Sequence, residues 1–321
     1  MSRSQHPGTD PPVPRGWSRQ AHVAIAGVVV VAVVAVTAAA VVITAEEDAP
    51  AVLPDAAAVF GDDGVLFASP RWARFSPTGR LVLVRTSAGI GLATGDDETP
   101  DSEVALLTPP GSRAVDAAWF PGETAVLVAE GPIPTGQLAV VELDGTVRGA
   151  VPLTPSFGVG TGHGMTVSPD GRHAVVTAEE REAVGGMLHL HLVFVDLEEG
   201  LVTELTRPDG PDESGPTFVS SEQVAYTETT AGADGGSRAM VLDLADGTVE
   251  PVSPLGDRAR AVGVVNGVPV YVSGDDVWIA ARGARRRLAA GLDGDVLAVH
   301  PTGSLVIVLL SGQAQLIRTG T

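Results

Sequence analysis

One short phrase recurs along this chain and limits the folds that it can adopt. The phrase is an apolar strand, the tetrapeptide Ser-Pro-x-Gly, and a second apolar strand. Clear copies contain residues 76–79 and 168–171, and a third copy at residues 300–303 has His in place of Ser. Proline presets φ for a tight turn, glycine permits a positive φ, and the flanking β-branched residues favour pleated strands. Each copy therefore predicts a β-hairpin.

The hairpins keep one period. Pro77, Pro121 and Pro169 follow one another at intervals of roughly 40–50 residues, and the interval from Pro169 to Pro301 holds three such periods. Three less regular copies complete the series: a partly conserved one at residues 119–128 (the worn copy) and two degenerate ones at residues 218–226 and 264–272. The six copies lie at residues 75–84, 119–128, 167–176, 218–226, 264–272 and 299–308. Self-similarity at such a period indicates a repeat architecture with one supersecondary unit per copy.

A second phrase alternates with the first. It reads Asp-Leu-x-x-Gly, a turn, and a strand that closes on Leu-Thr or a near equivalent. The copies lie at residues 193–206, 241–253 and, more loosely, 140–154, and Leu107-Thr108 closes the first unit. Two hairpins in fixed alternation give four strands per period of roughly 40–50 residues, which is typical of propeller blades.

The turn at residues 168–171, followed by Asp-Leu-x-x-Gly and Leu-Thr, resembles the repeat of the TolB-like (WD-repeat-like) β-propeller family. The resemblance covers about residues 59–321 and implies an all-β, six-bladed β-propeller. The last blade has sequence for three strands only, so we expect residues 65–68 to add its outer strand and close the ring. TolB carries an additional α/β domain before its propeller, whereas this chain has an apolar segment there.

That apolar segment predicts a transmembrane helix. Residues 23–44 hold no charge and would span roughly 33 Å as a helix, which is enough for a bilayer core. Arginines precede the segment and residues 46–48 are acidic, so the positive-inside rule places the N-terminus in the cytoplasm. The alternative is a signal peptide cleaved after Ala45, although secretory apolar cores usually run only about 7–15 residues.

These patterns divide the chain into four parts. They are a disordered cytoplasmic tail (1–20), one N-terminal transmembrane helix (21–45), a linker (46–58) and the propeller (59–321). The expected localisation is the cell membrane, single-pass, with the C-terminal domain extracytoplasmic.

Composition excludes several classes of function. The chain has no cysteine, which excludes disulfides, thiol catalysis and thiolate metal sites. Its basic residues are all Arg, and the formal net charge is -19. A net charge of this sign opposes attraction to nucleic acid, so no nucleic-acid partner is expected.

Candidate metal ligands are few. His163, His173, His189 and His191 fall in one repeat, but no matched carboxylate lies at a recognisable spacing, so we interpret them as ordinary strand and loop residues. The acidic turns at residues 62–63, 96–98 and 209–213 do not complete a calcium loop and are expected to be solvated.

Candidate catalytic and ligand-binding groups are also few. No Gly-x-Ser-x-Gly nucleophile elbow is present. Trp72, Trp119 and Trp278 are expected in the core. Residues 285–287, Arg-Arg-Arg, are expected at a solvated hairpin edge, with a carboxylate partner or phosphate head groups as the alternative. We therefore predict no catalytic, cofactor-binding or metal-binding residues and no cofactor.

The functional hypothesis is a noncatalytic scaffold in the cell envelope that binds an envelope protein, peptide or polymer on the rim or central funnel of a rigid ring. The alternative is a metal-dependent propeller enzyme, lactonase-like or lyase-like, with its site in the central channel. Convergent Asp, Glu, His or Asn side chains at the funnel would favour the alternative.

Overall fold

The computed structural model describes residues 65–68, 70–93, 104–131, 136–153, 158–159, 164–181, 188–207, 210–230, 236–252, 258–281 and 284–319. All of them belong to one compact unit, Val52–Thr321. The tail, transmembrane helix and linker predicted for residues 1–58 lie outside these ranges. The described residues contain no apolar helix of membrane-spanning length.

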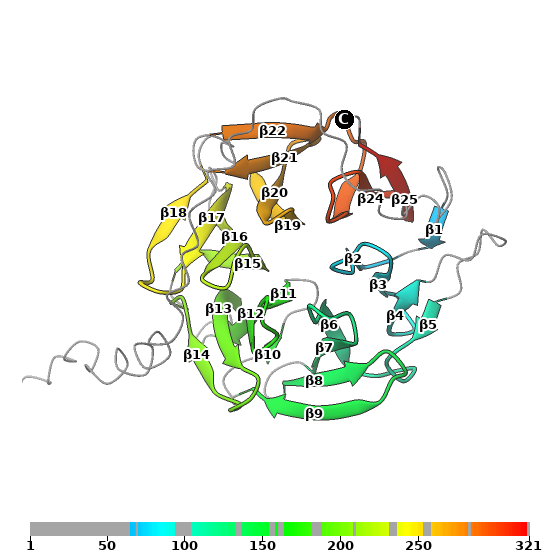
Figure 1. Cartoon of the computed structure of the whole chain (residues 1–321), viewed down its shortest axis with the longest axis vertical. Coiled ribbons are helices and arrows are strands. Elements are labelled where there is room, and N and C mark those ends of the chain that lie inside the picture. Colours follow the sequence, from blue (N-terminus) through cyan, green and yellow to red (C-terminus); the bar gives the residue numbers. More distant parts are fainter. Residues whose placement is uncertain are drawn as a thin grey trace, which may run out of the picture. The chain divides into compact units, whose positions relative to one another are not determined.

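The described strands form six antiparallel sheets around a central axis, which confirms the predicted six-bladed propeller (Figure 1). Blade 1 holds β2 (Trp72–Phe75), β3 (Val82–Arg85), β4 (Ile90–Ala93) and β5 (Val104–Leu106). Blade 2 holds β6 (Ala114–Trp119), β7 (Ala125–Glu130), β8 (Gln137–Glu142) and β9 (Val147–Pro152). Blade 3 holds β10 (Gly158–Val159), β11 (Met165–Val167), β12 (His173–Arg181), β13 (Leu188–Asp196) and β14 (Val202–Glu204), and both β10 and β11 pair with β12.

The remaining three blades follow the same plan. Blade 4 holds β15 (Asp212–Phe218), β16 (Gln223–Thr229), β17 (Ser237–Asp243) and β18 (Val249–Pro251). Blade 5 holds β19 (Ala259–Val265), β20 (Val268–Ser273), β21 (Asp276–Ala281) and β22 (Ala284–Ala289). Blade 6 holds β23 (Asp295–Val299), β24 (Leu305–Leu310), β25 (Gln313–Arg318) and, from the other end of the domain, β1 (Val65–Ala68).

The ring closes as the sequence predicts. β1 pairs antiparallel with β25, with Val65 opposite Gln315 and Ala68 opposite Gln313. The sheet order β1-β25-β24-β23 makes β1 the outer strand of the last blade. An N-terminal strand thus fastens the C-terminal blade, and the backbone edge of β25 is covered.

The Ser-Pro-x-Gly turns join the first and second strands of their blades. The glycine N–H donates to the carbonyl at the start of the turn, at 2.8 Å for Gly79 and 2.9 Å for Gly171. Both glycines have positive φ, +80° and +75°. In the worn copy of blade 2 this position is held by Glu123, also at positive φ (54°). The Glu123 carboxylate accepts hydrogen bonds from the backbone N–H and hydroxyl of Thr78 in blade 1, which offsets the strain.

The core is divided into six apolar clusters, each packed between neighbouring blades. Blades 6 and 1 also pack closely at their turns. His300 lies edge-on to Phe75, with ring centroids 5.1 Å apart, and a Cβ on Gly79 would lie 1.9 Å from His300 Nε2. Because a side chain at residue 79 would have to displace the His300 ring, this turn and the closing blade are matched to each other.

Candidate functional site

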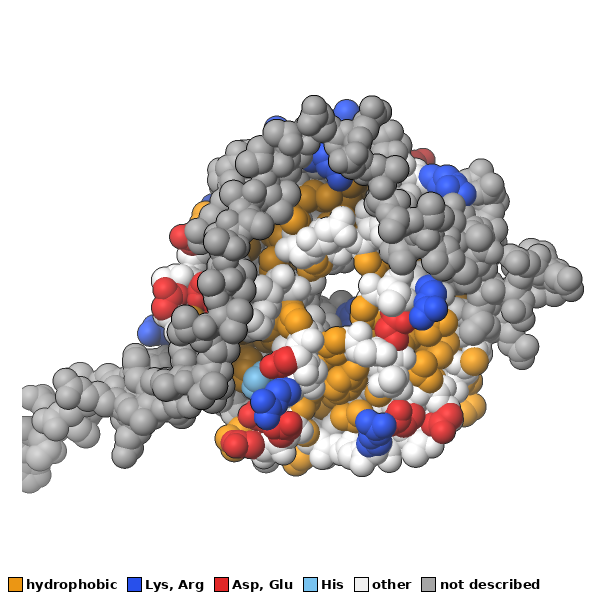
Figure 2. Space-filling view, in the orientation of Figure 1, with side chains coloured by type: hydrophobic (Ala, Val, Ile, Leu, Met, Phe, Trp, Pro, Cys, Tyr) orange, Lys and Arg blue, Asp and Glu red, His pale blue; other side chains and the backbone are white. Residues whose placement is uncertain are grey.

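The central channel is a cavity of about 870 Å³. Figure 2 shows it open at the middle of the ring. The first strands of all six blades line it, as expected for a propeller.

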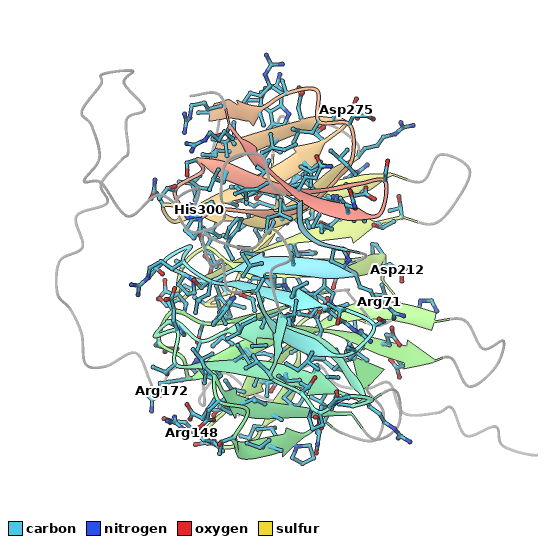
Figure 3. The ribbon with its side chains drawn as sticks, turned by 90° about the vertical axis from the view of Figure 1, so that its right-hand side faces the viewer. Arg71, Arg148, Arg172, Asp212, Asp275 and His300 are labelled. Carbon is cyan, nitrogen blue, oxygen red and sulfur yellow. The ribbon has the colours of Figure 1, made fainter. Side chains whose placement is uncertain are left out.

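The ring has two faces, and Figure 3 shows Arg148, Arg172 and His300 on one and Arg71, Asp212 and Asp275 on the other. We call these the turn face, which carries the Ser-Pro-x-Gly hairpins, and the strand-start face.

The charged side chains along the described channel wall are arginines. Arg71 and Arg74 come from the start of blade 1, and Arg260 comes from β19 of blade 5. No carboxylate and no histidine is among the described lining residues. Aromatic side chains, Trp72, Phe75 and Trp119 among them, supply apolar wall. The channel therefore combines apolar surface with positive charge.

Arg74 is held by a buried carboxylate. Its Nη1 lies 2.8 Å from Asp116 Oδ1, and the Asp116 side chain has no exposed surface. Arg74 also donates to the carbonyl of Ala117, and its guanidinium lies 4.8 Å from the ring centroid of Trp72. A charge-assisted bond and a cation–π contact together fix this guanidinium at the channel wall.

Asp116 joins three blades. It lies on β6 of blade 2, accepts the N–H of Ala117 at 2.8 Å, binds Arg74 of blade 1, and accepts the N–H of Gly164 of blade 3 at 3.0 Å. Both of its carboxylate oxygens therefore have donors. A buried charge is tolerated only with such compensation, so this aspartate is a structural anchor of the inner ring.

Arg85 interacts electrostatically with Asp116. Its Nη1 donates to the carbonyl of Val115 at 2.6 Å. Burial lowers the pKa of the Arg85 guanidinium, the neighbouring Arg71 charge lowers it further, and Asp116 acts in the opposite direction. Arg71 and Arg85 thus repel each other, and Asp116 partly offsets the charge of Arg85.

Among the described histidines of this repeat, His173 lies apart from His189 and His191. His163 lies outside the described residues. His173 is opposite Asp196 and His191 is opposite Ala178, so five register positions, roughly 17 Å, separate them along the sheet. His173 stacks on Phe194 at 4.9 Å, whereas His191 is fully buried and burial lowers its pKa. No group of three metal-ligating side chains occurs among the described residues.

One acidic turn is not the solvated loop that the sequence led us to expect. In the segment 209–213, Asp212 and Glu213 begin β15, and Asp212 accepts the N–H of Leu190 at 3.1 Å. Glu213 is 5% exposed and accepts a hydrogen bond from the Thr206 hydroxyl. The prediction failed because strand alternation turns Glu213 inward, a direction that a local count of charges does not reveal. Burial raises the pKa of Glu213 to about 7.

Stability should therefore depend on pH through Glu213. Its pKa is raised in the folded state, to about 7 from 4.5, so the protonated form favours folding. The stabilisation of the folded state by protonated Glu213 is complete below pH 4.5 and is lost as the pH rises through about 7. We expect the free energy of unfolding of the wild type, relative to Glu213→Gln, to fall by about 2 kcal/mol between pH 5.5 and 8. Urea unfolding at both pH values measures this, and the exposed Glu198→Gln is the control. A difference that does not change with pH would contradict the assignment.

The arginine run lies on the outer strand of blade 5, β22, which Figure 1 shows at the periphery. Arg285, Arg286 and Arg287 are exposed, as expected. The guanidiniums of Arg285 and Arg287 lie 4.7 and 5.8 Å from the ring centroid of Trp278. Trp278 is thus half-buried under arginine, whereas Trp72 and Trp119 are buried in the core as predicted.

Sequence reasoning missed the Arg74–Asp116 pair. A signal was present, because Asp116 is the one charged residue in the apolar strand Ala114–Trp119. A charge inside an apolar run points to a buried partner. The partner itself, which precedes it in the chain by about one repeat and lies on another blade, has no local signature.

The comparison with solved structures supports the fold. No family model matches the sequence, and no curated protein matches it. Among solved structures, TolB from Acinetobacter baumannii has a TM-score of 0.52 at 14% identity, over 80% of this chain and 65% of that chain. This chain thus spans slightly less than two thirds of that protein.

Two further structures cover their own chains more fully. The putative TolB from Agrobacterium tumefaciens has a TM-score of 0.52 at 14% identity, over 79% of this chain and 91% of that chain. The gluconolactonase XC5397 from Xanthomonas campestris has a TM-score of 0.56 at 12% identity, over 82% of this chain and 92% of that chain. At such identities the likeness shows the fold alone: the described domain is a six-bladed β-propeller similar in structure to TolB.

Proposed function

We propose that this chain is a membrane-anchored, extracytoplasmic β-propeller that binds an envelope protein, peptide or polymer without catalysing a reaction. The observation that carries the proposal is the channel wall. Its described charged side chains are arginines. Arginine binds anionic groups well, but it is a poor metal ligand and a poor general base at neutral pH. The fold shared with TolB is consistent with a binding role.

The location rests on the sequence. The uncharged residues 23–44, with arginines before them and acidic residues after them, support a retained anchor and an exported propeller. A membrane tether would keep a rigid ring in the cell envelope, which suits recruitment of a partner there.

A single-cysteine experiment tests location and binding together, because the chain has no cysteine of its own. Glu198→Cys probes the turn face and Asp275→Cys probes the strand-start face, since both positions are exposed. A membrane-impermeant maleimide that carries a photocrosslinker is applied to spheroplasts of the native host. We expect both variants to be labelled without permeabilisation and at least one to capture a defined partner, with or without EDTA.

Two controls make the result decisive. The cysteine-free parent reports background labelling, and permeabilised spheroplasts report total reactive thiol. Labelling only after permeabilisation would contradict the orientation. Capture that disappears with EDTA, or with His163, His189 and His191 all changed to Gln, would instead support the metal-dependent propeller enzyme.

A further inference from the structure

The channel wall has the opposite charge to the protein. The chain carries a formal net charge of -19, yet Arg71, Arg74 and Arg260 are the charged residues that line the described part of the channel. Solubility explains an acidic outer surface, but it does not explain arginines along the central channel of an acidic protein. Low-dielectric walls focus the potential of such groups into the cavity, so small anions are drawn in.

Positive charge is in excess in the arginine cluster beside Asp116. Arg74 pairs with the buried carboxylate of Asp116, which also interacts with the charge of Arg85, and Arg71 in turn repels Arg85. Three guanidiniums and one carboxylate leave two positive charges. Asp116 already accepts bonds from Arg74 and from the N–H groups of Ala117 and Gly164, so it has little capacity left to neutralise Arg71.

Free donors are available for a ligand. The Arg71 side chain is exposed and makes no ion pair or hydrogen bond with the described residues. Arg260 donates through Nη2 to the carbonyl of Val296 at 2.8 Å. A guanidinium has five N–H donors, so most of those on Arg260 remain. Asp275, Asp293 and Asp295 share a neighbouring recess with Arg260, which makes Arg71 the stronger anion ligand.

We propose that the channel binds a small oxyanion, a carboxylate or phosphate group, at its strand-start mouth through Arg71, with Arg74 and Arg260 as further donors. This inference rests on the proposed binding function and names the ligand class of the same channel. Planar guanidiniums match the geometry of both anions, and Arg74 is held in place by Asp116 and Trp72. The apolar walls at Phe75 and Trp119 suit the uncharged body of such a ligand.

The test is titration of the full chain in detergent with pyrophosphate and, separately, with citrate. Calorimetry gives the affinity, and tryptophan fluorescence reports the channel because Arg74 lies over Trp72. We expect one or both anions to bind, with affinity falling as NaCl is raised. The anion that binds identifies phosphate or carboxylate as the chemistry. Arg71→Gln should weaken binding about tenfold, and Arg71→Gln with Arg260→Gln should weaken it further.

The matched control is Arg172→Gln, which removes the same charge from the turn face, where Arg172 pairs with Glu198 at 2.7 Å. We expect it to bind as the wild type does. Binding of neither anion, or equal weakening by Arg172→Gln, would overturn the proposal. Partner capture in the cysteine experiment does not depend on either anion, so capture with no anion binding would leave the scaffold function standing and remove only this site.

Discussion

Deleting residues 59–69 should lower the melting temperature of the full chain by on the order of 10 °C. The deletion removes β1, the outer strand of blade 6, and leaves the β25 edge unpaired. Backbone pairing over a strand of this length contributes roughly 3 kcal/mol, and about 1 kcal/mol moves the melting temperature of a domain of this size by about 2–4 °C. Differential scanning calorimetry measures the shift.

The control deletes residues 47–57, an equal length of chain upstream of the strand, and should melt close to the wild type. A synthetic peptide of residues 59–69 should restore part of the lost stability, since an exposed edge accepts an added strand. If the 59–69 deletion melts as the wild type does, the pairing of β1 with β25 does not hold the ring closed.

Asp116→Ala should cost about 3–5 kcal/mol of unfolding free energy, because it removes the fully buried carboxylate that pairs with Arg74. It also strips the N–H of Gly164 of its acceptor and so loosens blade 3 from blade 2. Chemical denaturation measures the loss. The double variant Arg74→Met with Asp116→Ala should recover part of it, since the charge of Arg74 is then removed together with that of its partner.

The matched comparison is an exposed ion pair. Arg172 and Glu198 are also in contact, at 2.7 Å, but their side chains are 59% and 61% exposed. Glu198→Ala should therefore cost less than about 1 kcal/mol. Equal losses in Asp116→Ala and Glu198→Ala would show that burial of Asp116 adds nothing to the stability of the inner ring.

The strands were predictable because their signals are local. Proline and glycine at residues 77 and 79 dictate a turn, and the β-branched residues that follow dictate a strand, whatever lies elsewhere in the chain. Six such hairpins at one period predict six blades. The pairing of β1 with β25 was also predictable, since the last blade lacked a strand and residues 65–68 had no blade of their own.

Side-chain direction was less predictable. His189 and His191 were expected on one strand, and they lie on β13, but their distance from His173 follows from register. Glu213 was expected in solvent and is buried, because the strand begins earlier than the acidic turn suggests. A shift of one residue moves a side chain to the other face, and local composition does not fix that register.

The sequence by itself determined the repeat, the number of blades and the closing strand, since each depends on turn chemistry and on counting along the chain. Only the tertiary structure decided what the ring encloses. Arg74 and Asp116 lie on different blades, far apart in the sequence, and Arg260 faces the same channel from blade 5. Their meeting depends on how the blades are arranged around the axis, which is a property of long-range packing. A positive channel inside an acidic chain is therefore visible only in the folded ring.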